Sequence, residues 1–280
     1  MINQSDLKYF LELSQTLHLT RASERLGITQ PALSHCVKRL ELDLNCQLFL
    51  RSKKGVQLTP AGAKLKQSAS SMIQQWENLK QNITDDIETP QGVIRLGVHS
   101  AVAQYSLGFL GVFLKKNPAI EVQLTHGLSR HMTEQVVSSV LDVALAVNPA
   151  SHPDLIIKEI CRDEVCLWKS KNCQNEDVLL IEPSLLQTQD ILQKLNKKGF
   201  NFKRVIESAS LEVIANLVAQ GVGCGIVPER VLQIYESQSY EKIKGAPQFS
   251  DKICLVYKQE FRKVKRGQIF IESILNSIKG

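Results

Sequence analysis

The chain has 280 residues and a formal net charge of +6, and 43% of its residues are hydrophobic and 22% charged. This composition excludes collagen-like, disordered and disulfide-scaffold proteins, and the length suits a small domain joined to a larger one. No apolar run approaches the roughly 18 residues that a membrane span needs. The polar start, Met1 to Asp6, lacks the basic and apolar regions of a secretion signal. We therefore expect a soluble cytoplasmic protein with no membrane partner.

The first sixty residues carry eight Lys or Arg against five acidic residues and begin with a helical pattern. An apolar stripe predicts a first helix, which Ser5 is placed to cap. The stripe consists of Leu7, Phe10, Leu11 and Leu17.

Two further helices are expected at close spacing. The second runs over Arg21–Leu26 with Thr20 as its N-cap, and Gly27 can adopt the left-handed conformation that ends it. Thr29 caps the third helix, and Pro31 lies in its first turn, where a missing N–H costs little. The third helix buries Leu33, Val37, Leu40 and Leu44, and Asn45 ends it. Two helices joined by a short turn containing glycine form a helix-turn-helix.

The polar edge of the third helix is the candidate reading surface. Glutamine pairs with adenine edges, serine with several bases, and lysine with guanine or phosphate. Their position near the start of the helix suits insertion into a major groove. The alternative is an ordinary solvated helix face. The residues on this edge are Gln30, Ser34, His35 and Lys38.

A wing is predicted after the third helix. Two short extended runs, Phe49–Ser52 and Val56–Leu58, flank the basic turn Lys53-Lys54-Gly55. The two lysines can reach phosphates or a minor groove, and the alternative is a solvated hairpin tip. Helix and wing together make a winged helix-turn-helix.

A long helix is expected next, with Thr59 as its N-cap and Pro60 at its first position. Its apolar residues are spaced alternately by four and three, which is the seam of a two-helix coiled coil. The alternative is packing against the chain's own first domain. A two-fold dimer would present two recognition helices to half-sites about one helical turn apart. The seam consists of Leu65, Ala69, Met72, Trp76, Leu79 and Ile83.

At this point the sequence resembles the LysR-type transcriptional regulators. The resemblance is dense over about the first 65 positions, and it departs at Asn45, where the family usually has Gly, and at Cys36, where a polar residue is frequent. The matching residues are Phe10, Ala22, Leu26, Gln30, Pro31, Ser34, Leu40, Glu41, Leu44, Leu48, Phe49, Arg51, Leu58, Thr59, Ala61 and Gly62.

The resemblance implies a winged helix-turn-helix DNA-binding domain over 1–60, a linker and dimerisation helix over 61–90, and an effector-binding domain over 91–280. The implied partners are double-stranded DNA with a two-fold-related operator, a second copy of the chain in a homodimer or dimer of dimers, an unidentified small-molecule effector, and RNA polymerase. The expected DNA-binding residues are Thr20, Arg21, Gln30, Pro31, Ser34, His35, Lys38, Arg51, Lys53 and Lys54.

From Val93 the chain alternates apolar strands with helices, which argues for a parallel α/β sheet. The resemblance extends more weakly here and implies two lobes similar to periplasmic binding proteins: lobe I over about 91–162 and 258–280, and lobe II over about 163–257. The expected helices lie near 101–116, 129–141, 184–198, 210–220 and 262–278. The expected strands are Val93–Val98, Ile120–Leu124, Val143–Val147, Ile156–Ile160, Glu164–Trp168, Val178–Ile181, Arg204–Ile206, Gly223–Val227 and Ile253–Tyr257.

An effector site is expected beyond the carboxyl ends of these strands. Helix N-termini near Ala101 and Ser210 would offer N–H groups to an anion, and Arg130 and His131 would pair with an acidic ligand unless they are only solvated. The alternative for Ser100 and Ser210 is helix capping. The expected effector-binding residues are Ser100, Val102, Thr125, His126, Gly127, Asn148, Ser208 and Ser210.

Motifs of catalysis and metal binding are not found. The sequence has no G-x-x-x-x-G-K-[ST], no H-E-x-x-H and no G-x-S-x-G, and its seven cysteines include no C-x-x-C. The glycine-rich run from Gly221 follows a helix and precedes a strand, so we interpret it as a helix terminus. Cys161 and Cys166 suggest a thiol switch, but Asp163 and Glu164 would raise the pKa of a thiol, and buried cysteines in strands are favoured. We expect no catalytic residue, no metal and no cofactor.

The favoured function is a dimeric or tetrameric DNA-binding transcriptional regulator, tuned by a small molecule between its lobes. One alternative is a ligand-binding receptor whose N-terminal domain only dimerises. The others are a DNA-binding regulator without an effector and an enzyme on the two-lobed fold, for which no convergent set of acid, base or nucleophile stands out.

Overall fold

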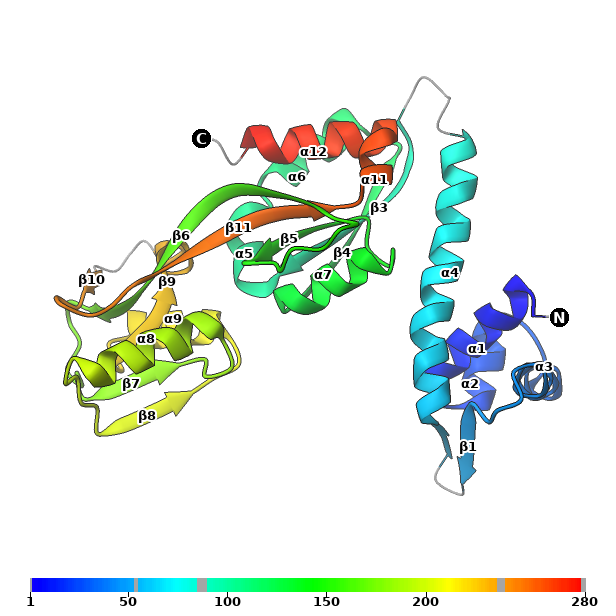
Figure 1. Ribbon diagram of the computed structural model, residues 1–280, viewed down its shortest axis with the longest axis horizontal. Coiled ribbons are helices and arrows are strands. Elements are labelled where there is room, and N and C mark those ends of the chain that lie inside the picture. The colour runs from blue at the N-terminus through cyan, green and yellow to red at the C-terminus, as the bar shows by residue number, and fades with distance from the viewer. Residues whose placement is uncertain (1, 53–54, 85–89, 236–239, 278–280) are drawn as a thin grey trace. The chain divides into compact units, whose positions relative to one another are not determined.

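A computed structural model describes residues 2–52, 55–84, 90–235 and 240–277, and these fall into two compact units (Figure 1). The N-terminal unit comprises residues 1–86 with 138–140, and the C-terminal unit comprises 87–137 with 141–280. No helix in the described ranges is both long enough and apolar enough to cross a membrane.

The N-terminal unit packs three helices and a hairpin against the first half of a long helix. Its core is apolar and closed: Phe10 and Leu33 have no exposed surface, and the Phe10 and Phe49 rings lie 5.3 Å apart between centroids. The elements are α1 (Gln4–Thr16), α2 (Leu19–Leu26), α3 (Gln30–Asp43), β1 (Phe49–Ser52), β2 (Gly55–Leu58) and α4 (Pro60–Thr84).

The expected ends of α2 and α3 are confirmed. Gly27 and Asn45 both have left-handed backbones, with φ of 65° and 50°, which is the conformation that ends a helix. Thr29 caps α3 by accepting the N–H of Ala32 at 3.4 Å. The hydroxyl of Thr59 likewise accepts the N–H of Gly62 at 3.0 Å at the start of α4.

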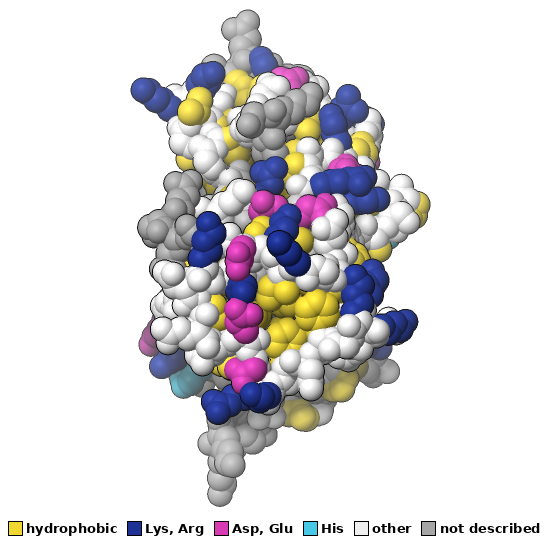
Figure 2. Space-filling model, turned by 90° about the vertical axis from the view of Figure 1, so that its left-hand side faces the viewer, with side chains coloured by type: hydrophobic (Ala, Val, Ile, Leu, Met, Phe, Trp, Pro, Cys, Tyr) yellow, Lys and Arg dark blue, Asp and Glu magenta, His cyan; other side chains and the backbone are white. Residues whose placement is uncertain are grey.

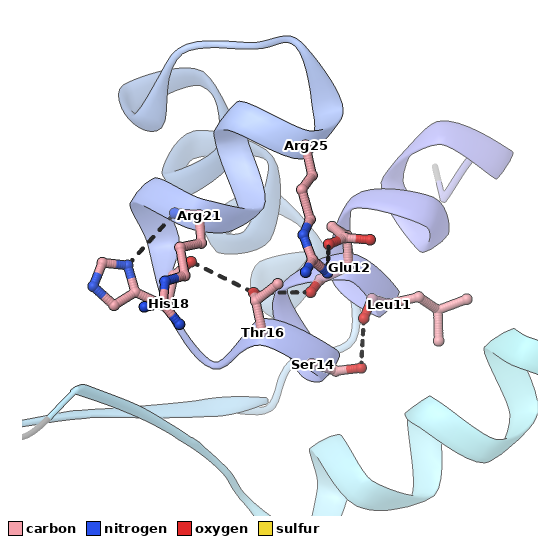
Figure 3. Close-up of polar contacts among 7 residues, drawn as sticks. All are labelled: Leu11, Glu12, Ser14, Thr16, His18, Arg21 and Arg25. Atoms are coloured by element: carbon pink, nitrogen blue, oxygen red, sulfur yellow. Dashed lines mark hydrogen bonds and ion pairs between the residues drawn. The ribbon is translucent and has the colours of Figure 1, made fainter.

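The expected caps of α1 and α2 are wrong. The α1 helix begins earlier, and Asn3 caps it by accepting the N–H of Asp6 at 2.9 Å. The α2 helix begins at Leu19, so Thr20 lies inside it, and the Nδ1 of His18 accepts the N–H of Arg21 at 3.5 Å (Figure 3).

The expected apolar stripe of α1 is correct except at its end. Leu17 is 41% exposed because it is the left-handed residue that terminates the helix, with φ of 51°. Leu13, one turn earlier, is 1% exposed and takes that place in the core.

Glu41 joins α3 to the wing. Its Oε1 accepts the backbone N–H groups of Leu48 at 2.8 Å and Phe49 at 3.1 Å, and both of these residues are buried. We expect Glu41→Ala to lower the free energy of unfolding by about 2 kcal/mol, because two buried donors lose their partner. Urea unfolding of the full chain measures this loss. Glu41→Gln keeps an acceptor oxygen and should cost less; equal losses from both substitutions would contradict this role of Glu41.

The C-terminal unit is built on one mixed sheet of nine strands, in the order β4-β3-β5-β11-β6-β9-β7-β8, with β10 paired to β6. Strands β3, β4 and β5 are parallel in lobe I, and β7, β8 and β9 are parallel in lobe II. The strands are β3 (Gly92–His99), β4 (Ile120–Gly127), β5 (Val143–Val147), β6 (Ile156–Ser170), β7 (Val178–Ile181), β8 (Arg204–Glu207), β9 (Cys224–Pro228), β10 (Tyr240–Lys242) and β11 (Phe249–Tyr257).

Helices cover both faces of each lobe, which buries the near-continuous apolar strands. In lobe I, α5, α6 and α12 pack on one face and α7 on the other. In lobe II, α9 and α10 pack on one face and α8 on the other. The helices are α5 (Ser100–Ser106), α6 (Phe109–Lys116), α7 (Ser129–Val137), α8 (Leu186–Lys197), α9 (Leu211–Ala219), α10 (Glu229–Gln233), α11 (Gln259–Lys263) and α12 (Lys265–Ser277).

Two long strands connect the lobes. Strands β6 and β11 run antiparallel and side by side from one lobe to the other (Figure 1). The sequence predicts two short strands, Ile156–Ile160 and Glu164–Trp168, where β6 is continuous. The polar stretch between the two apolar runs is the part of the strand that lies between the two cores.

Other elements also differ from expectation. The helix expected near 101–116 is divided into α5 and α6, and the last helix into α11 and α12. The short α10 and β10 are not anticipated, because five and three residues are too few for a periodic pattern.

The face of the C-terminal unit shown in Figure 2 carries a hydrophobic patch with a row of acidic side chains beside it.

Candidate nucleic-acid interface and interlobe cavity

The start of α3 presents the predicted polar edge to solvent. Gln30, His35 and Lys38 are exposed, as is Pro31, and Ser34 is half-buried. Their apolar counterparts on α3 are in the core, where Leu33, Val37 and Leu40 are no more than 2% exposed. The burial of one face therefore fixes which side of α3 faces outward.

The start of α2 lies beside this edge. The hydroxyl of Thr20 donates a hydrogen bond to Oε1 of Gln30 at 3.4 Å, so these two exposed side chains lie together although ten residues apart. Arg21 follows Thr20 on the same helix and is also exposed. The amide nitrogen of Gln30 stays available as a double donor, which is the group that pairs with an acceptor on a base edge.

Two of the nearby arginines are engaged within the unit. Arg25 pairs with Glu12 at 3.2 Å (Figure 3), and Arg39 pairs with the buried carboxylate of Asp6, which raises the pKa of the guanidinium. Within the described part of the chain, no acidic side chain pairs with Arg21 or Lys38.

The wing is an antiparallel hairpin in which Phe49 pairs with Leu58 and Ser52 with Gly55. Arg51 lies on β1, and its side chain is outside what the structure describes, as are Lys53 and Lys54 in full.

The expected seam of α4 divides into a part that packs in its own unit and a part that is exposed. Leu65 and Ala69 pack into the core of their own unit. For these two residues the alternative interpretation, packing against the chain's own first domain, is correct. Met72, Trp76 and Leu79 are 56%, 51% and 54% exposed, and their spacing places them on one face. The side chain of Ile83 lies outside the described residues.

A cavity of about 10 Å³, the size of roughly one water molecule, lies between the lobes. Lobe I lines it with β3, β5 and α5, lobe II lines it with α8, α9, α10 and the end of β9, and the crossing strands contribute one acidic residue each. The lining residues are His99, Ala101, Val102, Tyr105, Val147, Asp163, Gln187, Leu211, Pro228, Val231, Asp251 and Ile253.

Of the eight expected effector-binding residues, only Val102 lines this cavity. Thr125, His126 and Gly127 lie at the end of β4, an edge strand separated from the crossing strands by β3 and β5. Ser208 follows β8, the edge strand of lobe II.

Two of the other expected residues, Ser210 and Asn148, have local partners. Ser210 caps α9 by accepting the N–H of Val213 at 3.2 Å, which is the capping alternative. Ser100 is the first residue of α5 and is half-buried. The Nδ2 of Asn148 donates to Asp251 at 2.6 Å, so Asn148 holds a cavity side chain in place.

Asp163 and Asp251 occupy neighbouring positions on the two crossing strands. They are directly paired in the register of β6 and β11, and they are 3% and 2% exposed. Burial raises the pKa of both carboxyl groups, that of Asp251 to about 7, and for Asp251 the hydrogen bond from Asn148 opposes this while the Asp163 charge adds to it. Two buried like charges on paired strand positions disfavour ionisation of both carboxyl groups at once.

The raised pKa of Asp251 makes stability depend on pH. An aspartate with an ordinary pKa of 3.8 that rises to about 7 on folding stabilises the fold fully below 3.8 and loses that stabilisation as pH rises to about 7. We therefore expect Asp251→Asn to gain about 2 kcal/mol relative to the unsubstituted chain between pH 5 and pH 8. Urea unfolding at both pH values measures the gain, and an unchanged difference would contradict the raised pKa.

Sequence reasoning missed His99, Asp251, Gln187 and Tyr105. Strand alternation in the sequence points to Asp251, because Asp251 shares a strand face with Phe249 and Ile253. Its register partner Asp163 likewise shares a face with Val165. An acidic residue on an otherwise apolar strand face is the pattern that identifies this pair.

Three cysteines of the C-terminal unit carry thiols of raised pKa. Burial raises the pKa of Cys161 and Cys166, and that of Cys224 to about 12, so these sulfurs stay protonated and weakly nucleophilic at neutral pH. Among the described residues, no three His, Cys, Asp or Glu side chains come together as a metal site.

Two protein families match the chain. Residues 4–63 match the family described as "Bacterial regulatory helix-turn-helix protein, lysR family", and residues 88–278 match the "LysR substrate binding domain".

Three of the similar proteins match nearly the whole chain. The chain is 26% identical to the HTH-type transcriptional regulator YofA of Bacillus subtilis (strain 168) over 98% of both chains. Its fold matches the crystal structure of CbnR, a LysR family transcriptional regulator, with a TM-score of 0.71, 19% identity and full coverage of both chains. It also matches full-length CbnR in complex with its target DNA, with a TM-score of 0.69 and 19% identity over 99% of both chains.

Proposed function

The chain belongs to the LysR family of bacterial transcriptional regulators, and from this premise we propose that it binds a two-fold-related operator as a dimer or dimer of dimers and responds to a small molecule between its lobes. We assign the DNA-binding domain to 1–60, the dimerisation helix to 61–90 and the effector domain to 91–280. In this proposal it carries out no catalytic step, and it works in the cytoplasm, where it meets the chromosome and RNA polymerase.

The exposed start of α3 is the observation that carries the DNA-binding proposal. Gln30, Ser34, His35 and Lys38 follow one edge of a helix whose opposite face is fixed in the core. A helix of this kind enters a major groove with its N-terminal residues at the bases. Arg21 beside it and the lysines of the wing are assigned to phosphates, which position the protein without reading sequence.

The response to an effector is proposed to work through the lobes. A small molecule that binds one arrangement of the lobes more tightly shifts the population toward that arrangement. The DNA-binding heads of an oligomer then change their spacing. The cavity wall, formed by both lobes and both crossing strands, is the observation that supports this site.

Footprinting on the DNA upstream of the protein's own gene and its neighbour tests the proposal. We expect protection of two half-sites about one helical turn apart, with a change in extent or spacing when metabolites from a cell extract are added. Uniform protection along every fragment would overturn DNA readout. A sequence-specific footprint that no metabolite alters would support the alternative, a DNA-binding regulator that has no effector.

A further inference from the structure

We propose that the interlobe cavity binds a small organic cation through a primary ammonium group, held by Asp163, Asp251 and His99. This inference rests on the proposed effector function of the same cavity and adds the chemical class of its ligand.

The two carboxylates are the first observation. Asp163 and Asp251 are register partners on the two strands that connect the lobes, and both line the cavity. Asp251 uses one lone pair on each oxygen, accepting from Asn148 at 2.6 Å and from Gln187 at 3.3 Å. Asp163 accepts the N–H of Arg230 at 3.2 Å on Oδ1, while its buried Oδ2 has no partner in the structure. A buried carboxylate oxygen without a donor costs free energy, which a bound donor would recover.

His99 is a second and independent observation. It comes from lobe I at the end of β3, it is 7% exposed, and its buried Nδ1 has no hydrogen-bond partner. Burial lowers the pKa of His99, so the ring is neutral at neutral pH and can offer an acceptor nitrogen. The cavity therefore joins three side chains able to accept hydrogen bonds, and an ammonium group carries three N–H donors.

The charges around the cavity favour a single positive charge. Arg230 lies with its guanidinium 5.8 Å from the Tyr105 ring centroid and acts on Asp163, so it balances one of the two carboxylates. The second carboxylate needs a proton or a cation. A carboxylate ligand would add a third negative charge to the same buried space, which the burial of ions disfavours strongly.

The size and lining of the cavity fit the head of an amine. About 10 Å³ holds a group as large as one water molecule, which is the size of an ammonium group. The remaining wall is apolar, with Val102, Leu211 and Val231 among its residues, and would contact the carbon chain of an amine once the lobes part to admit it. A hydrated inorganic cation has no apolar group to bury against this wall.

The test is calorimetric titration of the full-length protein with n-butylamine, 1-butanol, butyrate and ammonium chloride at constant ionic strength. We expect n-butylamine to bind, 1-butanol and butyrate not to bind, and ammonium chloride to bind more weakly than the amine. Asp163→Asn and Asp251→Asn should each weaken amine binding by about 30-fold or more, since each removes one partner of a buried charge. Glu159→Gln is the matched control, because it removes the same charge from an exposed position on β6 outside the cavity lining, and it should change the affinity little.

Proton release gives a readout independent of affinity. An amine that replaces the proton held by one of the two carboxyl groups must release it, so titrations near pH 7 in two buffers of different ionisation enthalpy should differ for the unsubstituted chain and agree for Asp251→Asn. The titratable or charged groups that also interact with this pair are Cys161, Glu164, Tyr105, Glu229 and Arg230.

Three results would overturn the inference. These are binding of butyrate in preference to the amine, equal binding of butylamine and ammonium chloride, and no binding of any of the four compounds. None of them affects the footprint on DNA, whose absence would instead refute the proposed function.

Discussion

Replacing Gln30 or His35 by alanine is expected to weaken operator binding by about 5- to 150-fold while leaving binding to random duplex nearly unchanged. Each side chain is exposed on the outer edge of α3, and a good contact with a base edge is worth about 1–3 kcal/mol of discrimination. Binding to random DNA rests on phosphate contacts, which these two side chains do not supply in our account. Fluorescence anisotropy on the footprinted operator and on a scrambled duplex measures both affinities.

The controls for this prediction separate base contacts from fold damage. Gln15→Ala removes the same amide from an exposed position on α1, so it should leave both affinities unchanged. Lys53→Ala combined with Lys54→Ala should weaken both affinities and reduce the salt slope, as loss of phosphate contacts does. Equal losses on operator and scrambled duplex from Gln30→Ala would remove Gln30 from base readout.

Trp76→Glu is expected to dissociate the dimer, raising its dissociation constant by about 30-fold or more, and to weaken operator binding with it. Trp76 is 51% exposed at the centre of an apolar face completed by Met72 and Leu79. An exposed face of this kind on a helix marks an interaction site, and truncating a central tryptophan of an interface costs about 2 kcal/mol or more. Sedimentation velocity over a concentration series measures the dimer.

The matched control is Gln67→Glu, which adds the same charge on an exposed position of α4. Nine residues before Trp76, it lies on the opposite side of the helix and should leave the dimer intact. Leu65→Ala should behave differently from both, because Leu65 packs into the core of its own unit and its loss lowers stability. An unsubstituted chain that is monomeric at micromolar concentration, or a stable Trp76→Glu dimer, would refute dimerisation through this face.

Residues with strong local preferences were the ones that sequence predicted well. Gly27 and Asn45 tolerate the left-handed backbone that ends a helix, and Pro31 fits only a first turn, so the helix-turn-helix followed from local chemistry. The β1–β2 hairpin and the parallel strands of each lobe followed in the same way from apolar runs bounded by turn residues.

Tertiary context decided the features that sequence missed. His18 caps α2 although serine and threonine are the usual caps. The left-handed Leu17 ends α1, and the next residue, His18, therefore takes the N-cap position of α2. The continuity of β6 depends on its pairing with β11, which lies about ninety residues later. The apposition of Asp163 and Asp251 is likewise a consequence of register, and no local window contains both residues.

The most direct test of the account is competition for the purified full-length protein between its footprinted operator and bulk genomic DNA at a fixed salt concentration. We predict a preference of about 1,000-fold or more for the operator, which falls when the outer edge of α3 is altered at Gln30 or His35. Equal affinity for operator and bulk DNA would contradict the claim that this edge reads bases.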